Sequence, residues 1–388
     1  MVTPPLVSVT LDKDDVTLAR KLLKNRKTWE DKSLVSSYEA EFSEWNGSKF
    51  VFAFIKGRVA LSACIYALGL RPGDEVILPG YTCVVVPNAL HFAGLKTVFS
   101  DIELDTFGLD ASQIENKITS KTRAILIQHL YGLICRDYEA LIDIANKYNL
   151  KVIEDCAHAT GAEFNNQKVG NLGDCAFYSS EKSKIFTTIQ GGVAVTNEQE
   201  IANKLEEFSN SLDNPDDIFV EKLLNNVIIN YYKYKHPQRW WLGMLVSLNK
   251  HRKHLISTTV EEQRGIKPLH YGRKMPPPVA MLGSNQLKKI DAYNNSRRET
   301  SDRWKKWCLE NGYKPPFIKP GSLPVFLRYP LLVEPYKKQN THWALIDPGV
   351  RLGVWFKGNH HPINKPIRNC PKADIAVKQC VNLPGVLE

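Results

Sequence analysis

The sequence predicts an α/β fold in which a mostly parallel sheet is covered by helices on both faces. Segments typical of strands and segments typical of helices alternate between residues 50 and 196, as expected for parallel strands joined by helical crossovers. The chain has 388 residues, of which 43% are apolar, which is enough for a large core and usually for two domains.

The chain starts with about forty-five residues that are predicted to be helical and partly amphipathic. The segment 49–70 then predicts a strand, a turn at 56–58 and a helix through Leu68. Gly57 in this turn allows the backbone to approach a ligand closely. A helix that starts here would also present free N–H groups to a phosphate.

The same strand-then-helix order continues along the chain. The segment 75–79 predicts a strand and the residues after Thr82 a helix, and the following strand leads to a helix that begins at Asp110. A strongly apolar strand begins at Thr122 and is predicted to end at His129 and Tyr131. An amphipathic helix follows, whose apolar residues recur at steps of three and four. The strand KVIED follows and ends in Asp155.

Groups suited to one cofactor gather between residues 151 and 192. Asp155 ends one strand, Ser179 ends a second short strand, and Lys182, Lys184 and a Gly-Gly pair follow. An acid, a hydroxyl, an amine and a glycine-rich turn are the groups needed to hold pyridoxal phosphate, which carries an aldehyde, a phosphate and a ring nitrogen.

Each of these residues has a possible role and a plainer explanation. Asp155 would keep the ring nitrogen protonated, so that the ring accepts electrons, and Ser179 would donate to the phosphate. A neutral lysine would bind the aldehyde as a Schiff base, but the chemistry alone does not choose between Lys182 and Lys184. A lone aspartate at a strand end is more often a cap or a loop acid, and a lone lysine is usually solvated.

The spacing of these residues resembles that of the DegT/DnrJ/EryC1/StrS sugar aminotransferases, a family with the fold-type-I architecture of pyridoxal-phosphate-dependent transferases. EDCAHA is similar to the family's E-D-x-A-Q/H-A run, and KVGNLGDCAFYSS to its K-x-G-x-x-G-D-x-x-x-F-S segment. The resemblance implies that Lys184 is the cofactor lysine, Ser179 the phosphate-binding serine and Asp155 the acid that faces the pyridine. It also implies a cofactor contact for His158.

Two further motifs of the family are matched with departures. KGRVAL stands where the family has S-G-T-A-A-L, so Arg58 replaces a hydroxyl and either strengthens phosphate binding or points elsewhere. We expect the backbone of Gly57, Arg58 and Val59 to hold the phosphate. Cys83 stands where the family has an aromatic ring that stacks on the cofactor. Tyr81 could take over this contact, Cys83 could pack against the ring edge, or Cys83 could be a small buried apolar residue.

The resemblance also implies contacts with the substrate and with a second subunit. His129 and Tyr131 match a family motif near the substrate, although a histidine at a strand end is more often structural. HYGRKMPPPVA resembles a segment that reaches the neighbouring subunit's phosphate site, at the position of Lys274, with Arg273 beside it as a candidate substrate residue. The prolines at 276–278 should delay the next helix. We therefore expect a homodimer with shared active sites.

The domain organisation follows from the same resemblance. It implies a large cofactor-binding domain at 1–245 and a smaller C-terminal α/β domain at 246–388. The segment 213–265 is rich in aromatic and basic residues and is longer than expected between the family's motifs. We favour a helical insert at a subunit interface, with a role in shaping the substrate pocket or contact with a membrane surface as the alternatives.

Composition limits the other classes of function. The net charge is +10, but no recognisable nucleic-acid-binding motif accompanies it, and a positive cleft also suits phosphates. The sequence has no apolar run of about 20 residues, so we expect no membrane span, and its first residues lack the basic and apolar regions expected of a signal peptide. Its eight cysteines lack C-x-x-C spacing, which predicts reduced thiols in a cytoplasmic protein, and neither a disulfide framework nor a metal site.

The residues and the resemblance together predict a pyridoxal-phosphate-dependent transaminase. The amino donor would be glutamate and the acceptor a keto-sugar linked to a nucleotide, in polysaccharide or glycoconjugate biosynthesis. The alternatives are another carbonyl substrate, such as an acidic ulosonate or an aminocyclitol precursor, or a non-catalytic regulator that retains the fold. Lysine at position 184 argues against the dehydration chemistry of family members that carry histidine there.

Overall fold

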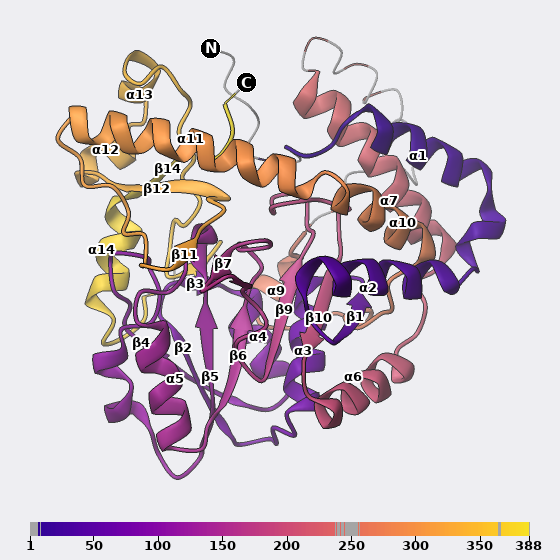
Figure 1. Cartoon of the computed structure of the whole chain (residues 1–388), viewed down its shortest axis with the longest axis horizontal. Helices are drawn as coiled ribbons and strands as arrows, with labels where there is room; N and C mark the ends of the chain where they lie inside the picture. Colours follow the sequence, from indigo (N-terminus) through magenta and orange to yellow (C-terminus); the bar gives the residue numbers. More distant parts are fainter. Residues whose placement is uncertain are drawn as a thin grey trace.

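A seven-stranded sheet forms the centre of the molecule (Figure 1). The computed structural model describes residues 7, 9–236, 238, 241, 244, 255, 257–363 and 366–387. The strands of the sheet are β1 Phe50–Phe54, β2 Glu75–Pro79, β4 Lys96–Ser100, β5 Thr122–Gln128, β6 Lys151–Asp155, β9 Cys175–Ser179 and β10 Gly192–Thr196. They follow the order β1-β10-β9-β6-β5-β2-β4.

Most of this sheet is parallel. Parallel pairing joins β4, β2, β5, β6 and β9. At one side of the sheet, β10 pairs in antiparallel fashion with both β9 and β1. Parallel strands are covered on both faces, so their sequences are nearly continuous apolar runs. β5 has this character, since six of its seven residues are buried. The predicted α/β fold with a mostly parallel sheet is confirmed.

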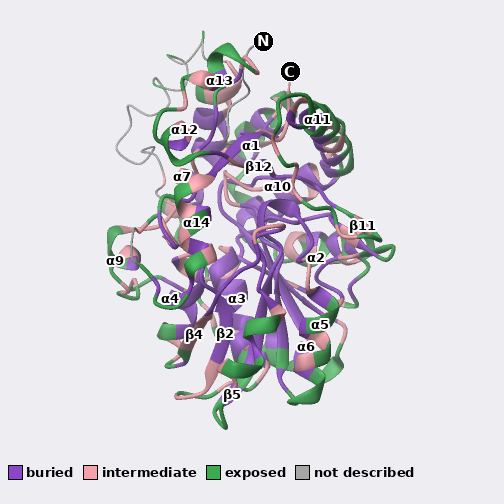
Figure 2. Ribbon diagram, turned by 90° about the vertical axis from the view of Figure 1, so that its left-hand side faces the viewer, coloured by how far each residue is buried: buried purple, intermediate pink, exposed green. Residues whose placement is uncertain are grey.

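Helices cover both sides of the sheet. Those of this part are α1 Lys13–Lys24, α2 Ser33–Asn46, α3 Gly57–Ala67, α4 Val85–Phe92, α5 Tyr138–Lys147, α6 Gln199–Ser211 and α7 Asp217–Asn230. Figure 2 shows α4 on one side of the sheet and α5 on the other. α3 packs against β9, β10, α4 and α6, and α5 packs against β5 and β6.

Shorter elements connect these helices and strands. They are β3 Thr82–Cys83, β7 Glu163–Phe164, β8 Gln167–Lys168 and the 3₁₀ helices η1 Arg26–Trp29, η2 Ala111–Gln113, η3 Glu115–Lys117 and η4 Leu130–Gly132. The α-helix predicted to begin at Asp110 is wrong, since η2 and η3 occupy its place. Asp110 still caps η2 by accepting a hydrogen bond from the Ser112 N–H at 3.1 Å. Ile114 alone is buried and apolar in this stretch, so a longer helix would lack an apolar face.

The C-terminal part adds a small antiparallel sheet and several helices. Its elements are α9 Val260–Gln263, α10 Pro277–Leu287, α11 Ile290–Glu310, β11 Ser322–Leu323, β12 Arg328–Leu332, α12 Pro335–Gln339, α13 Trp343–Ile346, β13 His360–His361, α14 Pro371–Gln379 and β14 Cys380–Pro384. β12 pairs with β14 over a core cluster of its own. β13 pairs in parallel with β3, and this pairing connects the C-terminal part to the part of the chain that forms the large sheet.

The proline run before α10 does not delay this helix. α10 begins at Pro277 and has prolines at its first two positions. The first N–H groups of a helix have no intrahelical acceptor, so prolines are tolerated there.

The segment 213–265 is described at its two ends. α7 and the π-helical turn η5 Tyr231–Lys235 lie near its start, and α9 lies near its end. Most of the aromatic and basic run between them lies outside the described residues, as does the predicted domain boundary at 245–246, so both stay predictions. Among the helices of the described part, none combines the length and the apolarity of a membrane span.

Candidate active site

A cavity of about 470 Å³ lies at the carboxyl ends of β5, β6 and β9. Ligands of α/β proteins bind at this edge of the sheet, because the loops that follow the strands meet there. The register pairs Gln128 with Asp155 and Asp155 with Phe177, so β5 and β6 end at the same level and β9 continues to Ser179. Charged and hydroxyl side chains in the wall include Lys56, Arg58, Asp155, Ser179, Glu181, Lys184 and Arg328.

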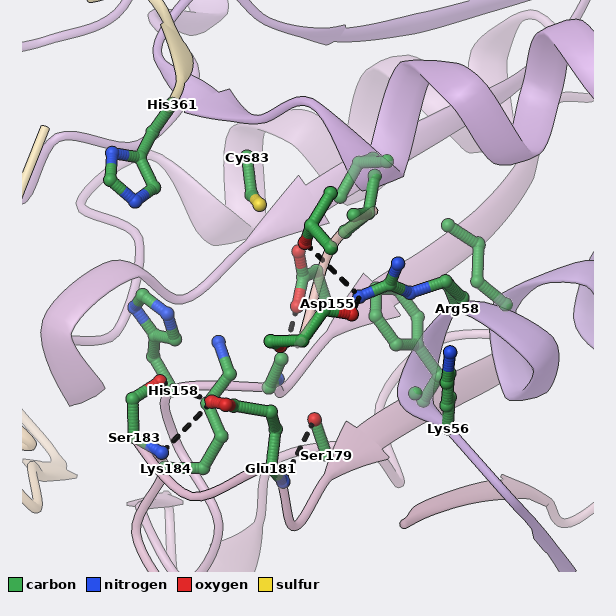
Figure 3. A pocket seen from close by; sticks show the side chains of 18 of the residues that line it. Lys56, Arg58, Cys83, Asp155, His158, Ser179, Glu181, Ser183, Lys184 and His361 are labelled. Carbon is green, nitrogen blue, oxygen red and sulfur yellow. Dashed lines mark hydrogen bonds between the residues drawn. The ribbon is translucent and has the colours of Figure 1, made fainter. Parts of the chain in front are cut away.

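Lys184 supplies an unpaired amine to this cavity. It follows β9 in a tight loop, where its N–H donates to the Glu181 carbonyl at 2.9 Å. Figure 3 shows its side chain beside those of His158 and Glu181. Within the described residues its Nζ makes no hydrogen bond or ion pair, and lies 5.4 Å from the centre of the Trp355 ring. Burial lowers the pKa of this amine, although Cys83 and Glu181 oppose the shift. A nucleophilic amine must be neutral, and this shift favours that form.

Asp155 is the buried acid of the cavity. It ends β6, is 6% exposed, and its Oδ1 accepts a hydrogen bond from the Ala157 N–H at 3.0 Å. Burial raises the pKa of its carboxyl to about 6, against the opposing effect of that hydrogen bond and of Lys184. A protonated ring nitrogen next to this carboxylate would favour its ionised form, which burial disfavours.

The start of α3 and Ser179 together form a cradle for an anion. Gly57 is the first residue of α3, and a Cβ added to it would lie 2.8 Å from the Ser179 Cβ, so only glycine allows this approach. The N–H groups of Gly57 and Arg58 donate to no acceptor within the described residues. The Val59 N–H, predicted as a third donor, instead donates to the Lys56 carbonyl at 3.0 Å. Two backbone donors and one hydroxyl therefore lie close together at the start of α3, which suits a phosphate.

Two basic residues, Arg58 and Lys56, lie beside this cradle and differ in their contacts. The Arg58 side chain points away toward α9, where it forms a buried ion pair with Glu262 and donates to the Ser257 carbonyl at 3.0 Å. Lys56 lines the cavity without a partner in the described residues. Burial and Arg58 lower the pKa of Lys56 to about 8. At neutral pH the cavity thus keeps positive charge near the cradle, mainly from Lys56.

Replacing Ser179 with alanine should weaken binding of pyridoxal phosphate to the cofactor-free protein by about 5- to 30-fold. This corresponds to roughly 1–2 kcal/mol for one hydrogen bond to a charged group. Equilibrium dialysis measures the affinity, with the same change at the exposed Ser211 as control. An affinity equal to that of the unaltered chain would remove Ser179 from the phosphate site.

The two predicted tyrosines do not line the cavity. Tyr81 and Tyr131 are fully buried, and their hydroxyls are 3.1 Å apart in a separate aromatic cluster. The Tyr81 ring packs 4.6 Å from that of Phe356. Tyr81 is therefore not placed to stack on a cofactor here, nor Tyr131 to contact a substrate. Cys83, in contrast, belongs to the cavity wall.

The two predicted histidines differ in what remains for a ligand. His129 reaches the cavity wall, but both ring nitrogens are used by the protein. Its Nδ1 accepts from the Cys135 N–H at 3.4 Å, so its Nε2–H donates to Glu154 at 3.1 Å. His158 stacks on Trp355 at 4.5 Å, and burial and Lys184 hold its pKa well below the ordinary value. Because both ring nitrogens of His129 already bind the protein, neither is left for the predicted contact with a substrate. His158, in contrast, presents a neutral ring to the cavity.

Arg273 and Lys274 lie outside the wall of this chain's cavity. Arg273 forms an ion pair with Asp216 at 3.2 Å. The Lys274 backbone donates to Asp213 at 3.0 Å and bridges to the end of β1 at Phe54. The structure therefore does not bring these two residues to the substrate or the phosphate cradle of their own chain.

Residues from the C-terminal part complete the cavity. Arg328 starts β12 and lies 3.8 Å over the Trp355 ring. His361 on β13 is held beside Cys83, because its carbonyl accepts from the Val84 N–H at 2.8 Å. Its buried Nδ1 has no hydrogen-bond partner among the residues that the structure describes, and burial lowers the pKa of this imidazole to about 4. The sequence carries one signal for them, a cluster of Trp, Phe and two histidines at 355–361.

Comparison with solved structures defines the class of this fold. An Escherichia coli GDP-4-keto-6-deoxy-D-mannose-3-dehydratase, solved with hydrated pyridoxal phosphate, superimposes with a TM-score of 0.74 at 20% identity. The superposition covers 99% of this chain and 95% of that one. The chain has the fold of the type-I pyridoxal-phosphate enzymes, as predicted.

Comparison of sequences defines the family. Residues 9–233 match the DegT/DnrJ/EryC1/StrS aminotransferase family, and the chain belongs to it. GDP-perosamine synthase of Caulobacter vibrioides is 40% identical over 171 residues, which cover 44% of this chain and 46% of that protein. The dTDP-3-amino-3,6-dideoxy-alpha-D-galactopyranose transaminase of Aneurinibacillus thermoaerophilus is 40% identical over 177 residues, covering 45% and 48%. The match thus spans about half the length of these curated relatives.

The residues of the cavity fit the cofactor that this family implies. The unpaired amine of Lys184 suits an aldehyde, and the buried carboxylate of Asp155 suits a protonated ring nitrogen. The free N–H groups of Gly57 and Arg58, with Ser179, suit a phosphate.

Proposed function

We propose that this chain is a pyridoxal-phosphate-dependent transaminase that moves an amino group from glutamate to a keto-sugar linked to a nucleotide. Polysaccharide or glycoconjugate biosynthesis would use the product. The unpaired Lys184 amine in a cavity that also holds a buried acid and an anion cradle is the observation that carries the proposal. The named activities of the relatives, which concern GDP- and dTDP-linked sugars, support the substrate class.

The chemistry divides among the residues of the cavity. The bound cofactor supplies an electron sink for negative charge at the carbon next to the amine. Asp155 keeps a proton on the ring nitrogen, and Ser179 with the start of α3 holds the phosphate. Lys184 would hold the aldehyde as a neutral amine and, once released, would be the base that takes up and returns the proton of the substrate carbon.

Arg328 is the side chain best suited to the donor's carboxylate. Its guanidinium is fixed against the Trp355 ring, is 7% exposed and lines the cavity. A planar, permanently charged guanidinium suits a carboxylate, because two parallel N–H groups can meet its two oxygens. An amino acid such as glutamate carries that group next to its reacting carbon, whereas the anionic diphosphate of a nucleotide-linked keto-sugar lies outside the sugar ring.

A homodimer with shared sites remains part of the proposal. Arg273 and Lys274 lie outside their own chain's cavity, which is compatible with a contact to the partner's phosphate site. All eight cysteines are free thiols, which supports a cytoplasmic location, where disulfides are rare. Sedimentation of the loaded protein as a monomer would count against the shared site.

An amino-transfer assay tests the proposed function. The loaded protein is mixed with L-glutamate and GDP-4-keto-6-deoxy-D-mannose, or with dTDP-linked 3-keto and 4-keto deoxysugars. We expect 2-oxoglutarate and an amino sugar of matching mass from at least one of them. Conversion of an acidic ulosonate or a cyclitol ketone alone would establish a different acceptor. A protein that binds the cofactor but releases no 2-oxoglutarate with any acceptor would contradict glutamate-dependent transfer.

A further inference from the structure

The loop after Lys184 is held in a strained conformation. Ile189 has a φ of +72°, which is rare for a β-branched residue. Such a conformation persists only where its surroundings fix it. Within the loop, the hydroxyls of Ser180 and Thr188 are 2.7 Å apart, and the Lys182 N–H donates to the Ile189 carbonyl at 3.2 Å. These bonds close the loop on itself but do not fix it relative to the sheet.

Two side chains from α10 and α11 connect this loop to the rest of the molecule. Arg297 on α11 donates from Nη2 to the carbonyl of Ile185, the residue after Lys184, at 2.6 Å. Gln286 on α10 accepts from the Thr187 N–H at 3.3 Å. The loop that carries the amine is thus tied to both helices.

Arg297 is also connected, through Asn294, to the loop that follows Asp155 and carries His158. Its Nη1 donates to the Asn294 side chain at 3.0 Å, and the Asn294 amide donates to the Thr160 carbonyl at 3.1 Å. One arginine therefore joins the loop after β9 to the loop after β6. These two loops carry Lys184 and His158, and they follow the strand ends at Ser179 and Asp155.

Arg297 is an unusual choice for a core position. It is 1% exposed, and no carboxylate forms an ion pair with it among the described residues. A buried charge without a counter-charge destabilises the folded state, and an apolar residue of similar volume would avoid this penalty. What the arginine adds at this position is its two hydrogen bonds, to the Ile185 carbonyl and to the Asn294 side chain.

We propose that Arg297 is a positioning residue for Lys184. By fixing the Ile185 carbonyl it keeps the preceding lysine amine inside the cavity, out of water and aligned with Asp155. This inference rests on the proposed role of Lys184 as the lysine that attaches the cofactor.

The charged and titratable groups that face Lys184 come from several elements, and Arg297 is not one of them. They are Cys83 of β3, Asp155 of β6, His158 of the following loop, Glu181 of its own loop, Arg328 of β12 and His361 of β13. Substitution of Arg297 removes none of these groups, so a change in the behaviour of Lys184 reports on the position of the two loops that Arg297 joins.

Attachment of free pyridoxal phosphate to the full-length, cofactor-stripped chain tests the inference. The initial rate of borohydride-trapped attachment at Lys184 is measured from pH 6 to 10 by peptide mass. For Arg297→Met we expect the midpoint of this profile to rise by about one pH unit, because a solvated lysine returns toward its ordinary pKa of about 10.4. Arg297→Lys should fall between, since one ammonium on a shorter reach keeps only one of the two contacts.

The controls separate positioning from folding. Arg303→Met alters an exposed arginine of the same helix and should leave the profile unchanged. If Arg297→Met does not fold, Arg297→Lys, which keeps the buried charge, decides alone. A midpoint of a folded Arg297 variant equal to that of the unaltered chain, even with a lowered Tm, would overturn the inference. Absence of attachment in the unaltered chain would instead overturn the proposed function, and this inference with it.

Discussion

Replacing Lys184 with alanine should abolish covalent attachment of pyridoxal phosphate and slow amino transfer by about 10³-fold or more. Both steps depend on one amine, which first binds the aldehyde and then moves a proton. The cofactor should still bind, because the phosphate cradle at Ser179 and the start of α3 is untouched. Absorbance of the loaded protein, borohydride reduction and peptide mapping measure attachment, and 2-oxoglutarate release measures transfer.

Lys182→Ala is the matched control for this experiment. Lys182 lies two residues away in the same loop, but its side chain is not part of the cavity wall. The control should attach the cofactor and turn over as the unaltered chain does. A reduced cofactor found on Lys182 would overturn the assignment of the whole stretch from Asp155 to the glycine pair.

The parts of the site that lie on neighbouring strand ends could be predicted from the sequence. Asp155 and Ser179 each end an apolar segment, and parallel strands bring such ends to one edge of a sheet. Gly57 precedes a helix, and a Cβ there would meet Ser179. Short-range pattern and strand order together are enough to bring these three residues to one cavity.

The other side of the cavity could not be predicted in this way. Arg328 lies on β12, which pairs with β14 in a small sheet of the C-terminal part. His361 lies on β13, which reaches the site because it pairs with β3, far away in sequence. Nothing local in the sequence encodes that pairing. His129 illustrates the opposite error, since a polar residue at the right strand end is committed to Glu154 within the core.

Asp155→Asn should lower the activity of the loaded protein and raise the stability of the cofactor-free protein. The change keeps the shape but removes the charge that holds a proton on the ring nitrogen, so stabilisation of negative charge on the substrate carbon is lost. We expect the rate of the glutamate half-reaction to fall by about 10²-fold or more, in line with the loss of a placed charge in a buried site. Stopped-flow absorbance of the loaded protein measures this rate. Near-normal activity of the variant would remove Asp155 from its proposed role.

The same change should stabilise the cofactor-free protein above pH 6. The pKa of Asp155 is raised by burial from 3.8 to about 6, so ionisation of this carboxyl disfavours the folded state. At pH 4 the acid is neutral in the folded state and about half ionised in the unfolded state, so Asp155→Asn should lie within roughly 0.5 kcal/mol of the unaltered chain. As the pH rises from 4 to 6 the variant should gain roughly 2–3 kcal/mol in free energy of unfolding and keep it at higher pH. Urea unfolding at pH 4 and pH 7.5 measures the difference, with Asp143→Asn on the exposed side of α5 as control. A variant less stable than the unaltered chain at pH 7.5 would show that Asp155 contributes to the fold itself, and not only to the binding of a cationic ring.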